Sequence, residues 1–267
     1  MGIKDIIKRQ PRLKRTALFI MRISSPVLSV AHCGAVLKYG RFLRDWVHFR
    51  RAGGRAAILD FYPCLFDRTP STPFDAHYFH QAVWALRHIV AAHVAEHVDI
   101  GSQSLFVGML SAVTHVTFVD IRPMKVSLPD YRGVQGSVLD LPFADNSIPS
   151  LSCLHVVEHI GLGRYGDAID PAGSAKAARE IVRVLMPGGR AYVSAPIGES
   201  RVQFNGQRVF AVEELLDLFG GLKTLEMIAV NGDGSLVECR NPALASIDRD
   251  ISGADCGLGM FLFEKEK

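Results

Sequence analysis

The chain has 267 residues, 48% hydrophobic and 21% charged, which excludes a globally disordered protein and allows one large domain with an extension. The net charge of +3 is small, so the chain as a whole is neither strongly basic nor strongly acidic. No CxxC pair occurs among the five cysteines, which favours a reducing compartment over a disulfide framework: Cys33, Cys64, Cys153, Cys239 and Cys256.

The first 55 residues are strongly basic. They contain 13 Lys and Arg against two Asp, a local charge of +11, whereas the rest of the chain carries 17 Lys and Arg against 25 Asp and Glu. Apolar residues such as Ile6 and Leu13 alternate with the basic ones, so we expect an amphipathic helical extension over residues 1–55. Its expected partner is an anionic membrane surface rather than nucleic acid.

Arg22 and Pro26 interrupt the apolar run that follows, which argues against a transmembrane helix. We therefore expect a cytoplasmic protein, peripheral at the inner membrane face.

Residues 56–267 are expected to form an α/β domain. Ala56–Phe61 is apolar and is predicted to be a short strand, and the spacing of apolar residues predicts a helix over 74–93. Strands then alternate with helices. The predicted strands are 97–100, 116–120, 133–138, 151–155, 190–195, 222–230 and 257–264, and the predicted helices are 105–112, 172–185 and 212–219. This alternation predicts a Rossmann-like, mostly parallel seven-stranded sheet with helices on both faces.

Two acidic strand ends indicate a ligand site. The first predicted strand ends in Asp99-Ile100-Gly101-Ser102, where glycine would let a ligand approach the backbone. The second ends about 20 residues later at Asp120, where a carboxylate can accept hydrogen bonds from ribose hydroxyls. In open α/β sheets ligands bind at the carboxyl ends of the strands, so the pair predicts a nucleotide-type site. The alternative is an ordinary turn and an ordinary loop aspartate.

A cluster of catalytic side chains follows the fourth predicted strand. His155, Glu158 and His159 would share one face if a helix began there, presenting two imidazoles and a carboxylate. A histidine is suited to act as general base because its pKa lies near neutrality. The H-x-x-E-H order also occurs in zinc proteases, but Gly161 and Gly163 would interrupt the long helix that such a site requires. Alternatively, Glu158 and His159 anchor the turn by hydrogen bonds.

Two further segments carry candidate substrate residues. In GLGRYGD, Arg164 could pair with a phosphate or carboxylate, and Tyr165 lies beside it. In FNGQRVF, Asn205 and Arg208 follow the fifth predicted strand on the same rim. The glycine-rich loop could instead be structural and pinned by an Arg–Asp pair.

The order DIGS, VDIRP, GSVLDLPFADNSIPSLSCLHVVEHI and EIVRVLMPGG resembles class I S-adenosylmethionine-dependent methyltransferases. More narrowly, FDAHYFHQAVWALR, HVVEHIGLGRYGD and FNGQRVF are similar to a bacterial family of unknown function related to these enzymes. Some members of that family occur with polysaccharide-synthesis genes. The resemblance covers about residues 56–265 and does not reach the basic segment.

The resemblance implies S-adenosylmethionine as cofactor. The positions that it assigns to cofactor binding are Asp99, Gly101, Ser102, Asp120, Ile121, Ser137, Val138 and Asp140. The chain departs from the family pattern at Gln103 and Leu105, which replace glycines, and their side chains are expected in the space of the methionine end. Ser137 replaces the usual acidic residue near the adenine, and Asp140 is the candidate substitute.

Three functions are therefore considered. The first is O-methylation of a sugar or glycolipid in envelope polysaccharide synthesis, with His155 or His159 as base. The second is a non-catalytic methyltransferase-like protein that binds glycans during their assembly. The third is a metal-dependent enzyme using His155, Glu158 and His159, although no resident metal is assigned.

Overall fold

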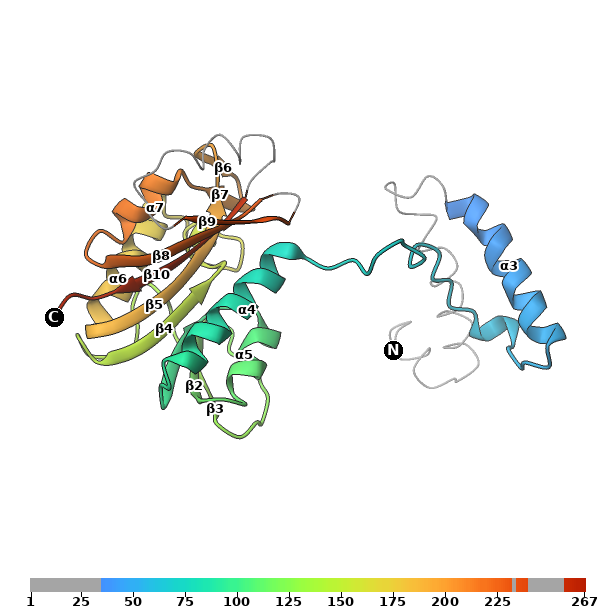
Figure 1. Cartoon of the computed structure of the whole chain (residues 1–267), viewed down its shortest axis with the longest axis horizontal. Helices are drawn as coiled ribbons and strands as arrows, with labels where there is room; N and C mark the ends of the chain where they lie inside the picture. Colours follow the sequence, from blue (N-terminus) through green and yellow to red (C-terminus); the bar gives the residue numbers. More distant parts are fainter. Residues whose placement is uncertain (1–34, 232–233, 240–256) are drawn as a thin grey trace, which may run out of the picture. The chain divides into compact units, whose positions relative to one another are not determined.

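A computed structural model describes residues 35–231, 234–239 and 257–267 (Figure 1). Contacts divide the chain into two compact units, Met1–Pro73 and Phe74–Lys267. This division falls later than the boundary that composition suggests after residue 55. Residues just beyond that boundary contact the preceding helix, since Trp46 Nε1 donates to the Ala56 carbonyl at 3.2 Å.

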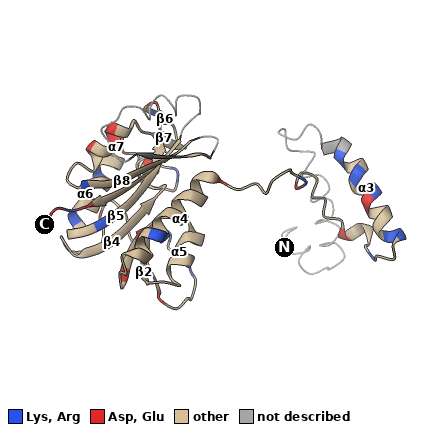
Figure 2. Ribbon diagram, viewed as in Figure 1, with Lys and Arg blue, Asp and Glu red and all other residues tan. Residues whose placement is uncertain are grey.

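The described part of the first unit contains helix α3 (Ala35–Arg51) and a single 3-10 turn, η2 (Ile58–Asp60). The strand predicted over 56–61 is therefore wrong. Phe61 instead packs edge-on against the rings of Phe42 and Trp46, with centroids at 5.0 and 5.2 Å. Basic residues recur along α3 (Figure 2), and residues 1–34 of the predicted extension lie outside the described residues. None of the described helices is both long and apolar enough to cross a membrane.

The second unit is built around one large sheet. Its strands, in spatial order, are β3 (Tyr131–Gln135), β2 (His115–Asp120), β1 (Glu96–Ile100), β4 (Ile148–Leu154), β5 (Leu185–Ile197), β10 (Gly257–Glu264), β8 (Lys223–Val230) and β9 (Leu236–Cys239). Its other elements are helices α4 (Ala76–Ala91), α5 (Ser104–Leu110), α6 (Gly173–Val184) and α7 (Val212–Leu218), the 3-10 turn η3 (Val157–His159), and a hairpin of β6 (Arg201–Gln203) and β7 (Gln207–Val209).

The predicted Rossmann-like, mostly parallel sheet is confirmed. β3, β2, β1, β4 and β5 are parallel neighbours, while β10 is antiparallel to both β5 and β8. All seven predicted strands are present, and β9 adds an eighth at the edge, antiparallel to β8. β3 ends at Gln135 rather than Val138 because the next residues form a turn closed by a bridge between Ser137 and Asp140.

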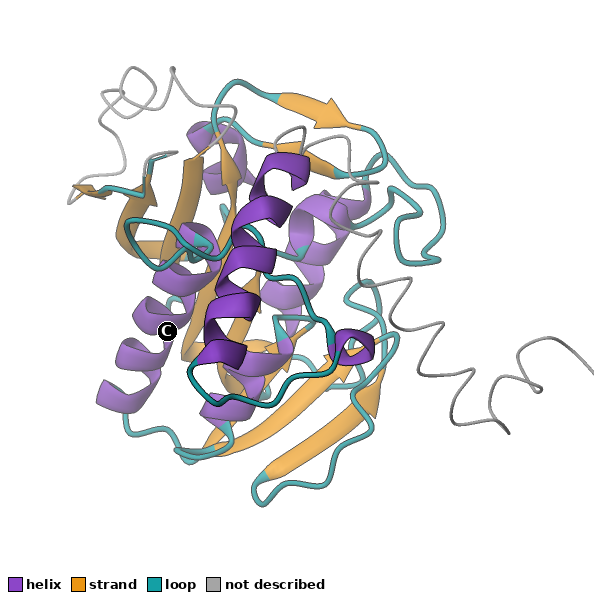
Figure 3. Ribbon diagram, turned by 90° about the vertical axis from the view of Figure 1, so that its right-hand side faces the viewer, coloured by secondary structure: helices purple, strands orange, loops and turns teal. Residues whose placement is uncertain are grey.

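Helices cover both faces of the sheet (Figures 1 and 3). On β2, Val116 and Phe118 belong to the core that contains α4 and α5, whereas Val119 belongs to the core that contains α6 and α7. Because successive side chains of a strand point to opposite faces, this division makes the sheet the middle layer of the unit. The carboxyl ends of the parallel strands consequently meet at one edge, where the candidate site lies.

Candidate active site

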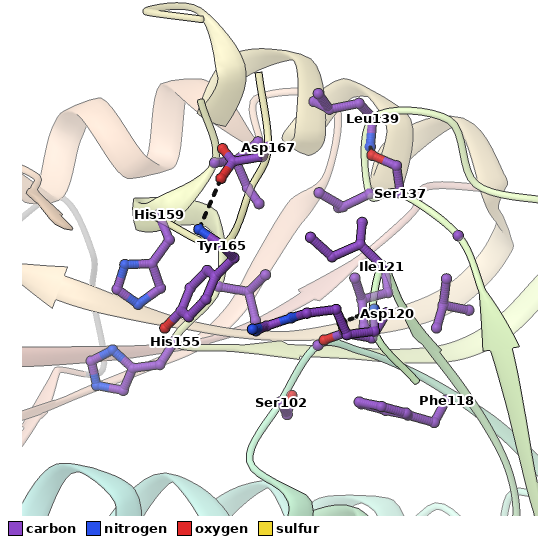
Figure 4. A pocket seen from close by; sticks show the side chains of 18 of the residues that line it. Ser102, Phe118, Asp120, Ile121, Ser137, Leu139, His155, His159, Tyr165 and Asp167 are labelled. Carbon is purple, nitrogen blue, oxygen red and sulfur yellow. Dashed lines mark hydrogen bonds between the residues drawn. The ribbon is translucent and has the colours of Figure 1, made fainter. Parts of the chain in front are cut away.

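A cavity of about 480 Å³ opens at the carboxyl ends of β1, β2 and β4. It gathers nine of the residues that the sequence indicated, from segments far apart in the chain. They are Gly101, Ser102, Asp120, Ile121, Ser137, Val138, His155, His159 and Tyr165. Figure 4 shows the two histidines with Tyr165 at one end, and Asp120, Ile121 and Ser137 toward the other.

The turn after β1 is held by hydrogen bonds to residues of β1, β2 and β4. Gly101 has φ +64° and donates its N–H to the Val119 carbonyl at 3.0 Å, a conformation that glycine adopts without strain. Asp99 is fully buried and does not line the cavity. Its Oδ1 accepts a hydrogen bond from the Ser102 backbone at 3.1 Å. Ser102 Oγ in turn accepts from the N–H of Leu154 at 3.1 Å, so β1 and β4 fix the turn together.

The two residues that replace family glycines do not fill the cavity. Gln103 and Leu105 are both exposed, Leu105 by 68%, and neither lines the cavity. The structure therefore places neither of these side chains in the cavity, although the sequence predicted them in the space of the methionine end. α5 begins at Ser104, and the helix buries Phe106 in the core while Leu105 faces solvent.

The ends of β2 and β3 supply the other side of the cavity. Asp120 Oδ1 accepts a hydrogen bond from the Arg122 backbone at 2.6 Å, which orients the carboxylate at the turn. Val138 is buried, and Ser137 Oγ accepts from the N–H of Leu139 at 3.1 Å. Asp140, in contrast, is exposed and lies outside the lining of the cavity.

His155 and Glu158 form a buried pair at the histidine end. Nδ1 of His155 lies 2.6 Å from Oε1 of Glu158, and their side chains are 8% and 0% exposed. Because an ionised carboxylate can only accept, Nδ1 of His155 donates the hydrogen bond to Glu158. Among the described residues, Nε2 has no hydrogen-bond partner. An imidazole held by a carboxylate on one nitrogen, with its other nitrogen free of protein hydrogen bonds, is the arrangement of a general base.

His159 is oriented through a different partner. Its Nδ1 lies 2.8 Å from the carbonyl of Gly206, in the turn between β6 and β7, and therefore donates to it. Burial lowers the pKa of His159, and the nearby Glu158 opposes that shift in part. The lowered pKa favours the neutral form of the His159 ring. The predicted shared helix face is replaced by the short turn η3, with His155 preceding it.

Helix α4 contributes residues that sequence reasoning missed. The ring of His77 stacks on that of His155 at 5.9 Å between centroids, and the ring of Tyr78 lies 5.1 Å away. The FDAHYFH segment shows helical spacing and a family resemblance, and neither indicates which strand end it covers. His77 and Tyr78 contact His155 without lining the cavity themselves. Lining residues that sequence reasoning did not single out include Ser104, Phe118, Arg122, Met124, Leu139, Val156 and Ile160.

The glycine-rich loop brings Tyr165 to the cavity. Its backbone N–H donates to Oδ1 of Asp167 at 3.3 Å (Figure 4), and Oδ2 of Asp167 accepts from Gly161 at 2.7 Å. The loop is therefore pinned by Asp167 through backbone groups rather than by an Arg–Asp pair. The guanidinium carbons of Arg122 and Arg164 lie 4.7 and 5.0 Å from the Tyr165 ring centroid.

Asn205, Arg208 and Arg164 lie outside the cavity lining. Asn205 is exposed in the turn between β6 and β7. Arg208 is buried, and its guanidinium donates to backbone carbonyls of the segment 158–171, among them Ile160 at 2.6 Å and Pro171 at 3.3 Å. The structure therefore gives Arg208 a role in holding the loop.

Within the described residues, no group of three or more His, Cys, Asp or Glu is arranged to hold a metal ion. His155 and Glu158, which the metal hypothesis would use as ligands, are hydrogen-bonded to each other.

The chain resembles known proteins in part of its sequence and in its fold. Residues 143–239 match a family described as Caenorhabditis protein of unknown function, DUF268. No curated protein matches the chain. Among solved structures, the N-methyltransferase NodS from Bradyrhizobium japonicum WM9, in complex with S-adenosylhomocysteine, is 14% identical with a TM-score of 0.50, over 77% of this chain and 92% of that one. The 1,6-didemethyltoxoflavin-N1-methyltransferase of Burkholderia thailandensis, with 1,6-didemethyltoxoflavin and S-adenosylhomocysteine bound, is 16% identical with a TM-score of 0.50, over 86% of this chain and 90% of that one. The chain therefore has the fold of the class I S-adenosylmethionine-dependent methyltransferases.

Proposed function

We propose that the protein is an S-adenosylmethionine-dependent methyltransferase that methylates a hydroxyl group, on a sugar or glycolipid of envelope polysaccharide synthesis. The observation that carries this proposal is the His155–Glu158 pair: His155 lines the same cavity as the glycine turn and Asp120, and Glu158 is buried behind it and hydrogen-bonded to its ring. A hydroxyl acceptor must lose its proton during methylation, and this pair provides a base for it.

The residues of the cavity fit the cofactor. Asp120 would hold the ribose hydroxyls, the Gly101 turn would face the methionine part, and Ile121 and Val138 would contact the adenine together with the buried ring of Phe118. When bound, S-adenosylmethionine would supply an activated methyl group. The side chains of Gln103 and Leu105 leave the space beside Gly101 open, since both are exposed.

In the proposed reaction Glu158 holds the Nδ1–H of His155, so that Nε2 accepts the proton of the acceptor hydroxyl as its oxygen is methylated. Glu158 stabilises the imidazolium that forms, because the two groups already lie 2.6 Å apart. Arg164 and Tyr165 would contact the acceptor at the mouth of the cavity. The basic segment 1–55 would hold the enzyme near a lipid-linked acceptor at the inner membrane face.

The first test is calorimetric titration of the full chain with S-adenosylhomocysteine. We expect micromolar affinity that Asp120→Ala removes and Glu158→Gln leaves within about twofold. Methyl transfer is then followed as S-adenosylhomocysteine release in the presence of sugar acceptors. His155→Asn and Glu158→Gln should each lower kcat by about 10²- to 10⁴-fold.

His115 and Asp130 provide a matched control. Their Nδ1 and Oδ1 atoms are also 2.6 Å apart, but the side chains are 70% and 46% exposed and lie outside the cavity. Asp130→Asn should leave kcat unchanged. Absence of S-adenosylhomocysteine binding at millimolar protein would exclude the proposed function, and full activity of Glu158→Gln would exclude the proposed base.

A further inference from the structure

Four polar side chains lie buried beneath the Gly101 turn, outside the cavity lining. They are His97, Asp99, Ser150 and Ser152, none more than 1% exposed. His97 and Asp99 alternate on β1, so their side chains leave the same face of the sheet. In the register between β1 and β4, Asp99 is the partner of Ser152, which brings the four groups together.

The four side chains form one continuous hydrogen-bonded chain. Nδ1 of His97 lies 2.8 Å from Oγ of Ser150, and Nε2 lies 2.8 Å from Oγ of Ser152. Ser152 Oγ donates to Oδ2 of Asp99, and Oδ1 of Asp99 accepts from the Ser102 backbone. The chain thus ends on the turn that faces the cavity.

When Asp99 is ionised, the number of available protons determines which atom donates in each of these hydrogen bonds. Ser152 has one hydroxyl proton and gives it to Asp99, so Nε2 of His97 must donate to Ser152 Oγ. A neutral imidazole then has its lone pair on Nδ1, which accepts from the hydroxyl of Ser150. Every donor in the chain consequently points toward the Asp99 carboxylate.

The surroundings favour a neutral histidine and a carboxyl that titrates at mildly acidic pH. Burial lowers the pKa of His97 to about 3. Burial also raises the pKa of Asp99 to about 6, opposed by its hydrogen bonds from Ser152 and Ser102 and assisted by the charge of Asp120. No described cationic side chain forms an ion pair with Asp99. Of the other titratable groups nearby, Cys153 lies on β4 beside Asp99, and Tyr192 on β5 faces His97 at 6.1 Å.

We propose that Ser150, His97 and Ser152 form a relay that keeps Asp99 ionised beneath the turn, and that this charge strengthens binding of the cationic amino-acid part of the cofactor. This inference rests on the proposed function. Three residues that do not line the cavity would thereby become positioning residues for the cofactor site.

The relay reverses when Asp99 takes up a proton. The chain takes up one proton at the Ser150 end, where the proton of the Ser150 hydroxyl moves to Nδ1 of His97 and the added proton replaces it. The Nε2 proton moves to Ser152, and the Ser152 proton moves to Oδ2 of Asp99. The ring therefore stays neutral but exchanges one tautomer for the other, and the negative charge beneath the turn disappears.

The tautomer can be read directly by NMR of the full chain labelled with ¹⁵N-histidine, with the His97 signals assigned from their loss in His97→Gln. We expect the Nε2–H tautomer at about pH 8 and the Nδ1–H tautomer at about pH 5, with no protonated ring at either pH. One unchanged tautomer across this range, or a charged ring, would overturn the relay. This readout needs no cofactor, so it decides the relay even if the proposed function fails.

The consequence for binding is tested by titrating S-adenosylhomocysteine between about pH 5 and pH 8. Affinity should decrease by up to about tenfold per pH unit below the Asp99 titration. Ser152→Ala removes the hydrogen bond to Asp99 and should move the midpoint upward by at least about half a pH unit. Ser150→Ala makes the same change at the far end of the relay and should move it less. Equal midpoints in wild type and Ser152→Ala would refute the link to cofactor binding.

Discussion

His155 combines an unusual backbone with a buried charge partner. Its φ of +56° is one that non-glycine residues rarely adopt, and its backbone N–H donates to Ser194 on the neighbouring strand at 3.0 Å. Other described non-glycine residues with positive φ, such as Asp130 and Asn146, do not line the cavity. Strained conformations of this kind are kept where surrounding contacts determine them and a site benefits from the orientation.

The two buried titratable groups of β1 have opposite effects on acid stability. Because the pKa of His97 is lowered to about 3, the unfolded chain takes up a proton that the native state refuses, and stability falls as pH decreases below about 6.5. Because the pKa of Asp99 is raised to about 6, the native state takes up a proton first, and stability rises as pH decreases from about 6 toward 3.8.

Asp99→Asn removes the effect of Asp99 on the pH dependence of stability and leaves that of His97. Between pH 6 and pH 4 we expect the variant to lose up to roughly 3 kcal/mol more of its unfolding free energy than the wild-type chain loses. Urea unfolding at several pH values measures this difference, with the exposed Asp217→Asn as control. A variant whose pH slope equals that of the wild type would show that Asp99 keeps an ordinary pKa.

The sequence predicts the position of some site residues and not the contacts of others. Gly101 and Asp120 follow strand ends, and that position alone predicts their place in the cavity. The partnership of Asp99 with Ser152 depends on the register of two strands more than 50 residues apart, which no local pattern reveals. The sequence therefore predicts a role for Asp99 but not for the side chain that hydrogen-bonds to it.

Besides Asp167, a buried arginine of β7 holds the loop between η3 and α6. Arg208 reaches across to the carbonyls of Glu158, Ile160, Asp170 and Pro171, at 2.6 to 3.4 Å. The same loop carries Tyr165. A single buried guanidinium therefore joins the hairpin to the segment that borders the cavity.

Arg208→Met keeps much of the side-chain volume and removes these donors. We expect it to lower the unfolding free energy by about 2–4 kcal/mol, since several buried carbonyls lose a charged partner. Denaturant unfolding is the measurement, and Arg132→Met on the exposed side of β3 should cost less than about 0.5 kcal/mol. Equal losses in the two variants would mean that the loop is held without Arg208.

The elements themselves were largely predictable. The alternation of strands and helices follows from periodicity, and the seven predicted strands exist. The short β6–β7 hairpin and β9 were missed because three or four residues carry too little pattern. The apolar run 56–61 forms no strand in the structure because it packs on aromatic residues of α3 instead of on a neighbouring strand.

At the scale of the whole molecule, the α/β unit has its own cores on both faces of the sheet. A chain beginning at Phe74 should therefore unfold cooperatively and bind S-adenosylhomocysteine within about twofold of the full chain. The full chain should bind anionic phospholipid vesicles at low salt, and the shortened chain should not. Co-sedimentation with anionic and with neutral vesicles separates the outcomes. Equal vesicle binding by both chains would place the membrane contact on the α/β unit.

The position of β10 has a consequence for biosynthesis. This strand, Gly257–Glu264, pairs with β5 on one side and β8 on the other, although both are translated before it. While the ribosome is still adding these residues, the two halves of the sheet have no strand between them. Phe261 and Phe263 complete one core, and Met260 and Leu262 complete the other. The domain consequently closes only after this segment has left the exit tunnel, so an emerging chain must be kept from pairing its two open strand edges with other proteins.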